Sequence, residues 1–317
     1  MVYSSKTTWE ICLRALLYAK GVCFPPLQIT GSILTAKADI LSKTRMWVAP
    51  SLSSGLGNRL FQYAAAAGAA EQWNRELVFY MPRCKESPHG SLSSIFKLFP
   101  SVRMIEHIQP YKEFVEPPRR FYQYIPLGQA APSENILVSG FRQSPLYFPK
   151  KITPDWDSAL GGPVIRRKVE TLAGLNTFAE RKQTYAIHVR LGDYKYLLHH
   201  QVNLSNYYRK ALEKVPRGSR LHLFSDEPDL CRNMFLDVVK AKELQLTLAV
   251  THSDIESLYE MSLCLGGTIT ANSTFSWWGA WFAHAEGAEW ATYPETMGDG
   301  QPEAVDLFPE WGTVIRC

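Results

Sequence analysis

The chain has 317 residues, of which 46% are hydrophobic, and its formal net charge is +4. At roughly 100–200 residues per domain, this length predicts two domains, and the apolar content excludes an intrinsically disordered chain. Basic residues occur only in short clusters such as 166–168, which are typical of a solvated helix face. The concentrated basic stripe of a nucleic-acid-binding protein is therefore missing, whereas a weak positive field suits a small phosphate-bearing substrate.

The cysteines and the early apolar residues indicate in which cellular compartment the protein is expected. The six cysteines form no C-x-x-C pair and no zinc spacing with histidine, which favours reduced thiols and a cytosolic protein. The most apolar early segment, 11–24, is interrupted by Arg14 and Lys20. It is too short for the roughly 20 apolar residues that span a bilayer, and no signal peptide is evident. We expect a soluble, cytoplasmic protein without a transmembrane anchor.

The first half of the chain opens with an extension, residues 1–45, in which we expect a helix from Thr8 to Lys20 and a break at Pro25 and Pro26. The organised fold is expected to begin at Met46. Its elements are a strand at 46–48, a small-residue loop at 51–58, an Ala-rich helix at 59–71, and strands at 77–80 and 136–138. The first four form a strand–loop–helix–strand unit. The stretch 82–129, rich in Pro and Ser, gives no clear pattern.

The second half alternates more regularly. Pro and Gly recur at 150–163, and we place a domain boundary there, dividing an N-terminal domain, 46–155, from a C-terminal domain, 156–317. Ser253 and Glu256 form a capping box that opens a helix. The expected strands are 184–189, 220–224, 245–250 and 268–271, and the expected helices are 205–215, 229–240, 253–263 and 273–284. This alternation predicts an α/β fold with a parallel, Rossmann-like sheet, which binds ligands at the carboxyl ends of its strands.

The first motif at such a strand end is 188–194 (HVRLGDY). His188 and Arg190 lie on the same face of an extended chain, because side chains alternate with a period of two. Arg190 can bind a phosphate bidentately without a metal, and Gly192 permits a turn that returns Asp193 to the pocket. The alternative is a simple salt bridge between Arg190 and Asp193.

The second motif, 272–281 (NSTFSWWGAW), stands at the start of the last expected helix. The exposed backbone N–H groups and the hydroxyls of Ser273, Thr274 and Ser276 form a potential anion site. Alternatively, the hydroxyls only cap the helix and the tryptophans pack in a core. The residues alone favour neither interpretation.

The third motif is 223–227 (LFSDE). At the end of its strand, Asp226 could accept two N–H hydrogen bonds from guanine. The alternative is that this segment caps the helix that follows.

The fourth motif is 55–64 (GLGNRLFQYA), which is neither a Walker A loop nor G-x-G-x-x-G. Gly55 and Gly57 allow a close approach of the backbone, and the following helix presents its positive end. A helix-opening loop without a ligand is the alternative.

Together the four motifs resemble those of glycosyltransferase family 11, the family of α-1,2-fucosyltransferases. The family's strings are G-G-L-G-N-Q-L-F-Q-Y-A, H-x-R-R-G-D-Y, F-S-D-D and N-S-[ST]-F-S-W-W-G-A-[WY]-L, and all four occur here in that order. Residues 306–311 are similar to the closing D-L-[FY]-P-x-W, so the resemblance runs from Met46 to the C-terminus. The chain departs from the pattern at Ser54 (for Gly), Arg59 (for Gln), Leu191 (for Arg) and Glu227 (for Asp).

The resemblance implies a GT-B-like fold, in which two Rossmann-type domains face each other across a cleft. It implies an inverting transfer of L-fucose from GDP-β-L-fucose to a hydroxyl of a glycan acceptor, through an α-1,2 linkage to galactose or a similar sugar, without a metal or other cofactor. Arg190 is expected to hold the β-phosphate, and Asp193 is the candidate general base, with orientation of Arg190 as its other possible role. The expected donor-binding residues are Gly57, Asn58, His188, Arg190, Ser225, Asp226, Asn272, Ser273, Thr274 and Phe275.

Other functions remain open from the residues. Asp155-Trp156-Asp157 has the D-x-D spacing of metal-dependent transferases, but it reads as a helix start. A protein O-fucosyltransferase or another inverting sugar-nucleotide transferase would use a similar donor site. An inactive protein that binds a glycan or a nucleotide is the alternative from a different class, and intact Arg190 and Asp193 argue against it.

Overall fold

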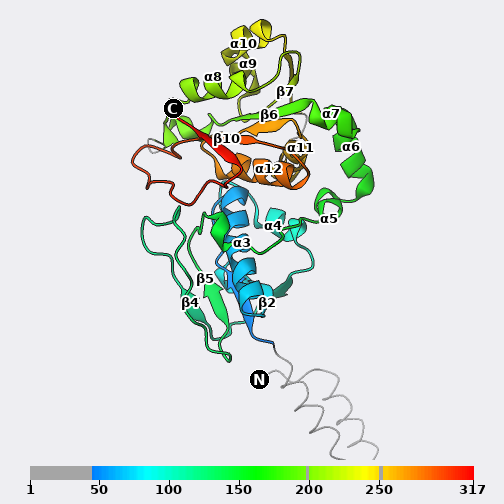
Figure 1. The fold of residues 1–317 in the computed structure, drawn as a ribbon. Helices are drawn as coiled ribbons and strands as arrows, with labels where there is room; N and C mark the ends of the chain where they lie inside the picture. The colour runs from blue at the N-terminus through cyan, green and yellow to red at the C-terminus, as the bar shows by residue number, and fades with distance from the viewer. Residues whose placement is uncertain (1–44, 198–199, 250–252) are drawn as a thin grey trace, which may run out of the picture. The chain divides into compact units, whose positions relative to one another are not determined.

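The computed structural model describes residues 45–197, 200–249 and 253–317. The helix expected at 8–20 and the break at Pro25 and Pro26 lie outside the described residues. Residues 46–317 form one unit by their mutual contacts. Figure 1 shows that this unit contains two sheets with helices packed on them.

The first sheet follows directly from the strand–loop–helix–strand pattern. Its five strands are parallel in the order β3-β2-β1-β5-β4. They are β1 (Trp47–Pro50), β2 (Glu76–Tyr80), β3 (Arg103–Ile105), β4 (Lys112–Phe114) and β5 (Ile136–Val138), with the helices α3 (Leu56–Gln72) and α4 (Leu92–Leu98) and the short 3₁₀ turns η1 (Met81–Arg83) and η2 (Pro145–Tyr147). Helix α3 begins three residues before the expected start, because extended Gly55 serves as its N-cap. Gly57 and Asn58 therefore lie in its first turn.

The second sheet has six parallel strands in the order β11-β10-β9-β6-β7-β8. Its strands are β6 (Thr184–Val189), β7 (Arg220–Ser225), β8 (Gln245–Leu248), β9 (Gly267–Ile269), β10 (Ala291–Pro294) and β11 (Gly312–Ile315). Its helices are α5 (Trp156–Leu160), α6 (Pro163–Ala173), α7 (Phe178–Lys182), α8 (Ser205–Glu213), α9 (Pro228–Met234), α10 (Leu236–Ala241), α11 (Asp254–Ser262) and α12 (Thr274–Ala285), with the 3₁₀ turn η3 (Asp193–Lys195). The α/β fold class with two parallel sheets is confirmed.

One expected helix is wrong. The segment 229–240 forms two helices, α9 and α10, which meet at Phe235. Phe235 has a non-helical ψ of 3° and is buried in the cluster that lines β6 and β7. Burial of this aromatic side chain ends the first helix, although the local sequence has no Pro or Gly to mark the break. The capping box at Ser253 and Glu256 is present as expected.

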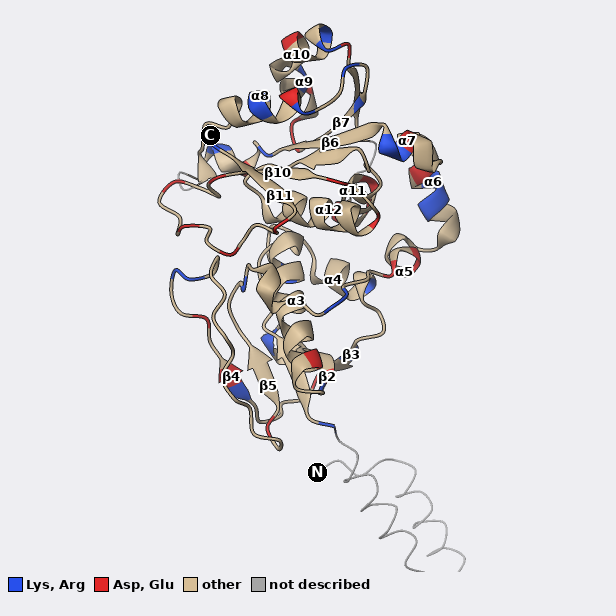
Figure 2. Cartoon of the chain, viewed as in Figure 1, with Lys and Arg blue, Asp and Glu red and all other residues tan. Residues whose placement is uncertain are grey.

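The two sheets share a core, in which α3 packs against α12. Phe61 of α3 lies 4.5 Å from Trp277 and 5.2 Å from Trp278, measured between ring centroids, and both tryptophans are buried. Helix α12 carries no Lys, Arg, Asp or Glu, whereas α6, α7 and α10 do (Figure 2). Of the two interpretations of the tryptophan pair, core packing is therefore the one that the structure shows.

All strands of the first sheet precede residue 155, and all strands of the second follow it. Because the contacts place 46–317 in one unit, the division into two domains stays a prediction. We refer to 46–155 as the first half of this unit and to 156–317 as the second half. None of the helices in the described ranges has the length and apolar character needed to cross a membrane.

Candidate functional site

A cavity of about 940 Å³ lies at the carboxyl ends of the second sheet's strands and is lined by both halves. The first half contributes the start of α3, with Gly57 and Asn58, together with His89 and Phe141. The second half contributes His188, Arg190, Asp193, Ser225, Asp226, Ser273, Thr274 and Phe275. Three of the four motifs extend from strands of the second sheet, and the fourth opens α3. The fold therefore gathers at one cavity the segments that the sequence singled out.

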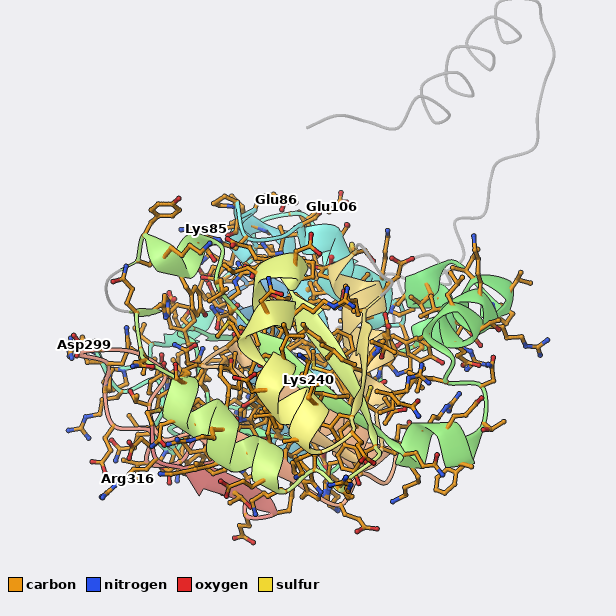
Figure 3. The ribbon with its side chains drawn as sticks, turned by 90° about the horizontal axis from the view of Figure 1, so that it is seen from above. Lys85, Glu86, Glu106, Lys240, Asp299 and Arg316 are labelled. Atoms are coloured by element: carbon orange, nitrogen blue, oxygen red, sulfur yellow. The ribbon has the colours of Figure 1, made fainter. Side chains whose placement is uncertain are left out.

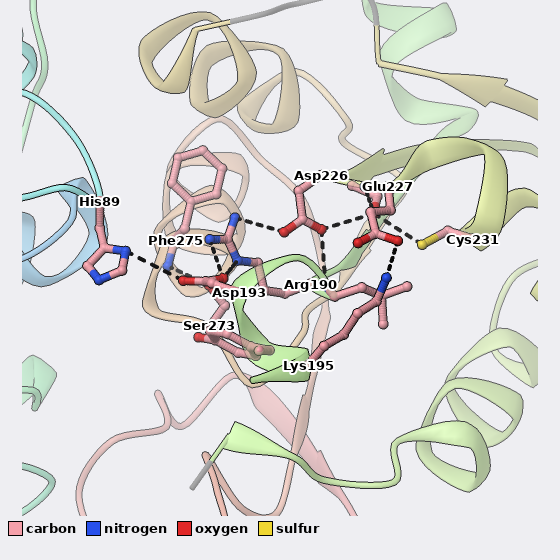
Figure 4. A network of polar contacts seen from close by, with 12 residues as sticks. His89, Arg190, Asp193, Lys195, Asp226, Glu227, Cys231, Ser273 and Phe275 are labelled. Atoms are coloured by element: carbon pink, nitrogen blue, oxygen red, sulfur yellow. Dashed lines mark hydrogen bonds and ion pairs between the residues drawn. The ribbon is translucent and has the colours of Figure 1, made fainter. Parts of the chain in front are cut away.

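Arg190 stands directly after β6 and is held between two carboxylates. Its Nε and Nη2 donate to Oδ1 of Asp193 at 3.0 and 2.7 Å, and its Nη1 lies 3.2 Å from Oδ2 of Asp226. Figure 4 shows the guanidinium between these two residues. A Cβ at Gly192 would lie 2.3 Å from Asp226 Oδ2, so a larger residue here would displace the Asp226 carboxylate. The guanidinium is oriented, but it remains about one-third exposed at the cavity.

His188 is a buried neutral base in the same wall. Burial, helped by the neighbouring Arg190, lowers the pKa of His188 to about 4, and Asp226 opposes that shift only in part. Its Nδ1 is buried without a hydrogen-bond partner among the described residues. Buried polar atoms are nearly always hydrogen-bonded, so this nitrogen is suited to a polar group of a ligand. At neutral pH the imidazole can offer one donor and one acceptor.

Helix α12 points its N-terminus at the cavity. Ser273 is the N-cap, and its Oγ accepts a hydrogen bond from the Phe275 N–H at 3.3 Å. Thr274 and Phe275 line the cavity beside it. The first turn of a helix carries backbone N–H groups without intrahelical partners and a partial positive charge, which together suit an anion.

Three expected binding residues have partners within the protein. Asn272 does not line the cavity, because its buried side chain donates to the carbonyls of His200 and Met297. Asn58 does line it, and its Oδ1 accepts from Gln143 Nε2 at 2.7 Å. Ser225 Oγ accepts from the Glu227 N–H at 3.0 Å. Asn272 thus holds loops together, while the other two stand at the cavity wall.

The D-x-D segment lies away from this cavity. Asp155 caps α5 by accepting from the Ser158 N–H at 2.9 Å, and Asp157 lies 3.1 Å from Arg166 Nε. Neither residue lines the cavity. In the ranges that the structure describes, no group of three or more His, Cys, Asp or Glu side chains is arranged to hold a metal ion.

No motif in the sequence pointed to His89. It comes from the Pro- and Ser-rich stretch without a clear pattern, and its Nδ1 lies 3.5 Å from Oδ2 of Asp193 in the other half. Figure 4 shows the ring directed at Asp193 from a separate segment of the chain. No local pattern could have identified this residue, because its position depends on how the two halves pack.

Position 191, where the family pattern has a second arginine, faces away from the cavity. Leu191 packs against the buried cluster that contains Val189 and Tyr208, as expected from its alternation with Arg190.

We therefore expect Leu191→Arg to lower the free energy of unfolding by about 1–3 kcal/mol and to leave the donor KM unchanged. Denaturant unfolding and initial-rate kinetics measure the two effects. A several-fold lower KM at unchanged stability would contradict this orientation.

An oriented arginine and a helix N-terminus at the ends of parallel strands form an arrangement that suits an anion. Residues 164–311 match the model described as Glycosyl transferase family 11. Over this region the chain is similar to glycosyltransferase family 11.

Among curated proteins, the chain is similar to the O-antigen biosynthesis glycosyltransferase WbnK of Escherichia coli, with 35% identity over 114 residues. The match spans 32% of this chain and about a third, 35%, of WbnK. Among solved structures, it is similar to the fucosyltransferase NodZ from Bradyrhizobium, with 15% identity, a TM-score of 0.42, and coverage of 75% of this chain and 93% of NodZ. It is also similar to POFUT1 in complex with GDP-fucose, with 13% identity, a TM-score of 0.43, and coverage of 85% and 98%.

Proposed function

We propose that the protein is an inverting fucosyltransferase that moves L-fucose from GDP-β-L-fucose to a hydroxyl of a glycan, forming an α-1,2 linkage to galactose or a similar sugar. The observation that carries the proposal is Arg190 beside the N-terminus of α12, within the region that matches the family 11 model. Both features supply positive charge at one wall of the cavity, and a nucleoside diphosphate is an anion that such a wall can bind.

Within this proposal, Arg190 and the first turn of α12, with Ser273, Thr274 and Phe275, hold the diphosphate. His188 and Asp226 face the guanine, and the unpartnered Nδ1 of His188 supports the first of these roles. Gly57 and Asn58 approach the donor from the first half of the unit. All of these residues line the same cavity, whereas Asn272, which was also expected to bind the donor, holds loops instead.

The proposed chemistry follows from the charges. The sugar passes through an oxocarbenium-like transition state while negative charge grows on the departing GDP. Arg190 and the N–H groups of α12 stabilise that charge, and preorganised donors of this kind contribute several kcal/mol in comparable sites, about 2.7–4 kcal/mol for one donor. Attack by the acceptor hydroxyl from the opposite side inverts the β-fucoside to an α-fucoside.

A glycan acceptor is supported by the similarity to WbnK, whose name assigns it to O-antigen biosynthesis. The decisive experiment offers GDP-fucose and other sugar nucleotides with a panel of galactosides that includes lactose, and identifies products by mass spectrometry. Transfer of a deoxyhexose from GDP-fucose, and from none of the other sugar nucleotides, supports the proposal. Removal of that deoxyhexose by an α-1,2-specific fucosidase supports the linkage. Transfer from another sugar nucleotide only, or no transfer at all, would contradict it.

We expect transfer to persist in EDTA, because Arg190 and the start of α12 supply the positive charge that a metal ion would otherwise provide. The measurement compares initial rates before and after chelation, with Mn²⁺ added back. Loss of activity on chelation, restored by Mn²⁺, would show that the reaction depends on a metal.

A further inference from the structure

His89 is the one histidine that the first half presents to the cavity among the residues described there. Its side chain is about half exposed, so an ion pair with Asp193 would contribute little to stability. The ring is nevertheless placed against the carboxylate that also holds Arg190. A weak contact between two halves, made at the cavity itself, points to a role in the reaction rather than in the fold.

The segment that carries His89 is fixed by a buried arginine. Arg59 of α3 is completely buried, and its Nη1 donates to the Gly90 carbonyl at 2.8 Å while its Nη2 donates to the Lys85 carbonyl at 3.2 Å. Lys85 and Glu86 themselves lie at the outer edge of the molecule (Figure 3). Arg59 is one of the departures from the family pattern, in which this position is usually Gln. Two hydrogen bonds from one rigid guanidinium hold both ends of the His89 turn.

The two oxygens of Asp193 have separate partners. Oδ1 accepts both hydrogen bonds from Arg190, and Oδ2 faces Nδ1 of His89. A carboxylate at Nδ1 favours the tautomer that carries its proton there, which leaves a lone pair on Nε2. Nε2 makes no hydrogen bond to any described residue. The arrangement thus orients the ring and places the Asp193 carboxylate beside the imidazolium that forms when Nε2 accepts a proton.

The other carboxylates of the cavity are less available as bases. Asp226 is paired with Arg190 and accepts from the Leu191 N–H at 3.0 Å. Asp254 accepts from Ser94 Oγ at 3.0 Å and from the Ile255 N–H at 2.8 Å. Both carboxylates are thus already engaged by donors of the protein.

We propose that His89 is the general base that activates the acceptor hydroxyl, with Asp193 as its positioning residue; this inference rests on the proposed fucosyl transfer. Nε2 takes the hydroxyl proton as the acceptor oxygen forms its bond to C1 of fucose. The bond between C1 and the β-phosphate oxygen breaks, and its electron pair leaves with GDP, whose charge Arg190 stabilises. The imidazolium, beside the Asp193 carboxylate, then releases its proton to water.

The test compares His89→Ala with His107→Ala, which removes an exposed histidine of the same half that does not line the cavity. Donor binding is measured as the calorimetric Kd for GDP, and transfer is measured with GDP-fucose and lactose. We expect His89→Ala to keep its Kd for GDP and its acceptor KM while kcat falls about 10²–10⁴-fold, the usual contribution of a general base. Added imidazole should restore part of kcat in His89→Ala, whereas His107→Ala should behave as wild type.

The outcomes separate the two proposals. A wild-type protein that transfers no fucose would overturn the proposed function and the role of His89 with it. An active wild type combined with an unchanged kcat in His89→Ala would overturn the role of His89 alone. A fall in kcat that is matched by weaker GDP binding and is not rescued by imidazole would assign His89 to holding the two halves together, and would equally refute the base.

Discussion

Arg190→Ala is expected to abolish transfer and to weaken GDP binding. The substitution removes a charge-assisted phosphate contact of about 1.5–3 kcal/mol. The corresponding increase in the Kd for GDP is roughly 10- to 150-fold. Asp193 and Asp226 would also lose their shared cation and would face the diphosphate directly, so repulsion adds to the loss. Calorimetric titration with GDP and a transfer assay measure the two effects.

The matched control is Arg217→Ala. Arg217 also forms an ion pair, with Glu243, but both side chains are about two-thirds exposed and lie away from the cavity. Exposed pairs contribute little, so both GDP affinity and transfer should stay at the wild-type level. If a folded Arg190→Ala variant turned over as fast as this control, the assignment of the phosphate site would be wrong.

Gly57→Ala is expected to impair stability and transfer together. Gly57 lies in the first turn of α3 and approaches the first turn of α12 so closely that an added methyl carbon would lie 2.6 Å from the Phe275 nitrogen and from the Thr274 carbonyl carbon. Both are backbone atoms, which cannot rotate aside. Inside a helix, alanine is otherwise favoured over glycine by about 1 kcal/mol. A lower unfolding free energy of Gly57→Ala would therefore indicate crowding, and a higher one helix propensity.

Overpacking of this kind costs about 1–3 kcal/mol of unfolding free energy. The strain should also displace the start of α12 at the cavity wall, and a displacement of about 1 Å can lower a rate roughly 10²-fold. Denaturant unfolding and kcat/KM measure these losses. A Gly57→Ala protein that is more stable than wild type, as helix propensity alone predicts, would show that α3 and α12 do not make this contact in solution.

The sequence alone predicted which segments of the second half line the cavity, because Arg190, Asp226 and Ser273 each follow a pattern that is local in the chain. Strand β6 has the expected bounds, 184–189, since its six residues form a continuous buried run. Arg190 and Asp226 come directly after parallel strands, and Ser273 directly before a helix. Parallel strands end at one edge of the sheet, so residues that follow them meet there whatever the surrounding details.

Some local structure was set by packing. The break between α9 and α10 is placed by burial of Phe235, and α3 begins early because Gly55 takes an extended conformation at its start. The short strands β10 and β11, with four residues each, lack a pattern strong enough to be recognised in isolation. These features depend on contacts that no window of the sequence contains.

The sequence by itself therefore determined the fold class, the family motifs and the arginine that follows strand β6 at the cavity. Only the tertiary structure decided that Trp277 and Trp278 are core residues, that Asn272 holds loops, and that His89 meets Asp193. The physical reason is that some positions are fixed by local structure and others only by packing between the two halves. Periodicity and strand ends fix side chains relative to their own sheet, whereas the contact between two halves is fixed by the fit of α3 against α12, where Gly57 leaves room for the backbone of Thr274 and Phe275.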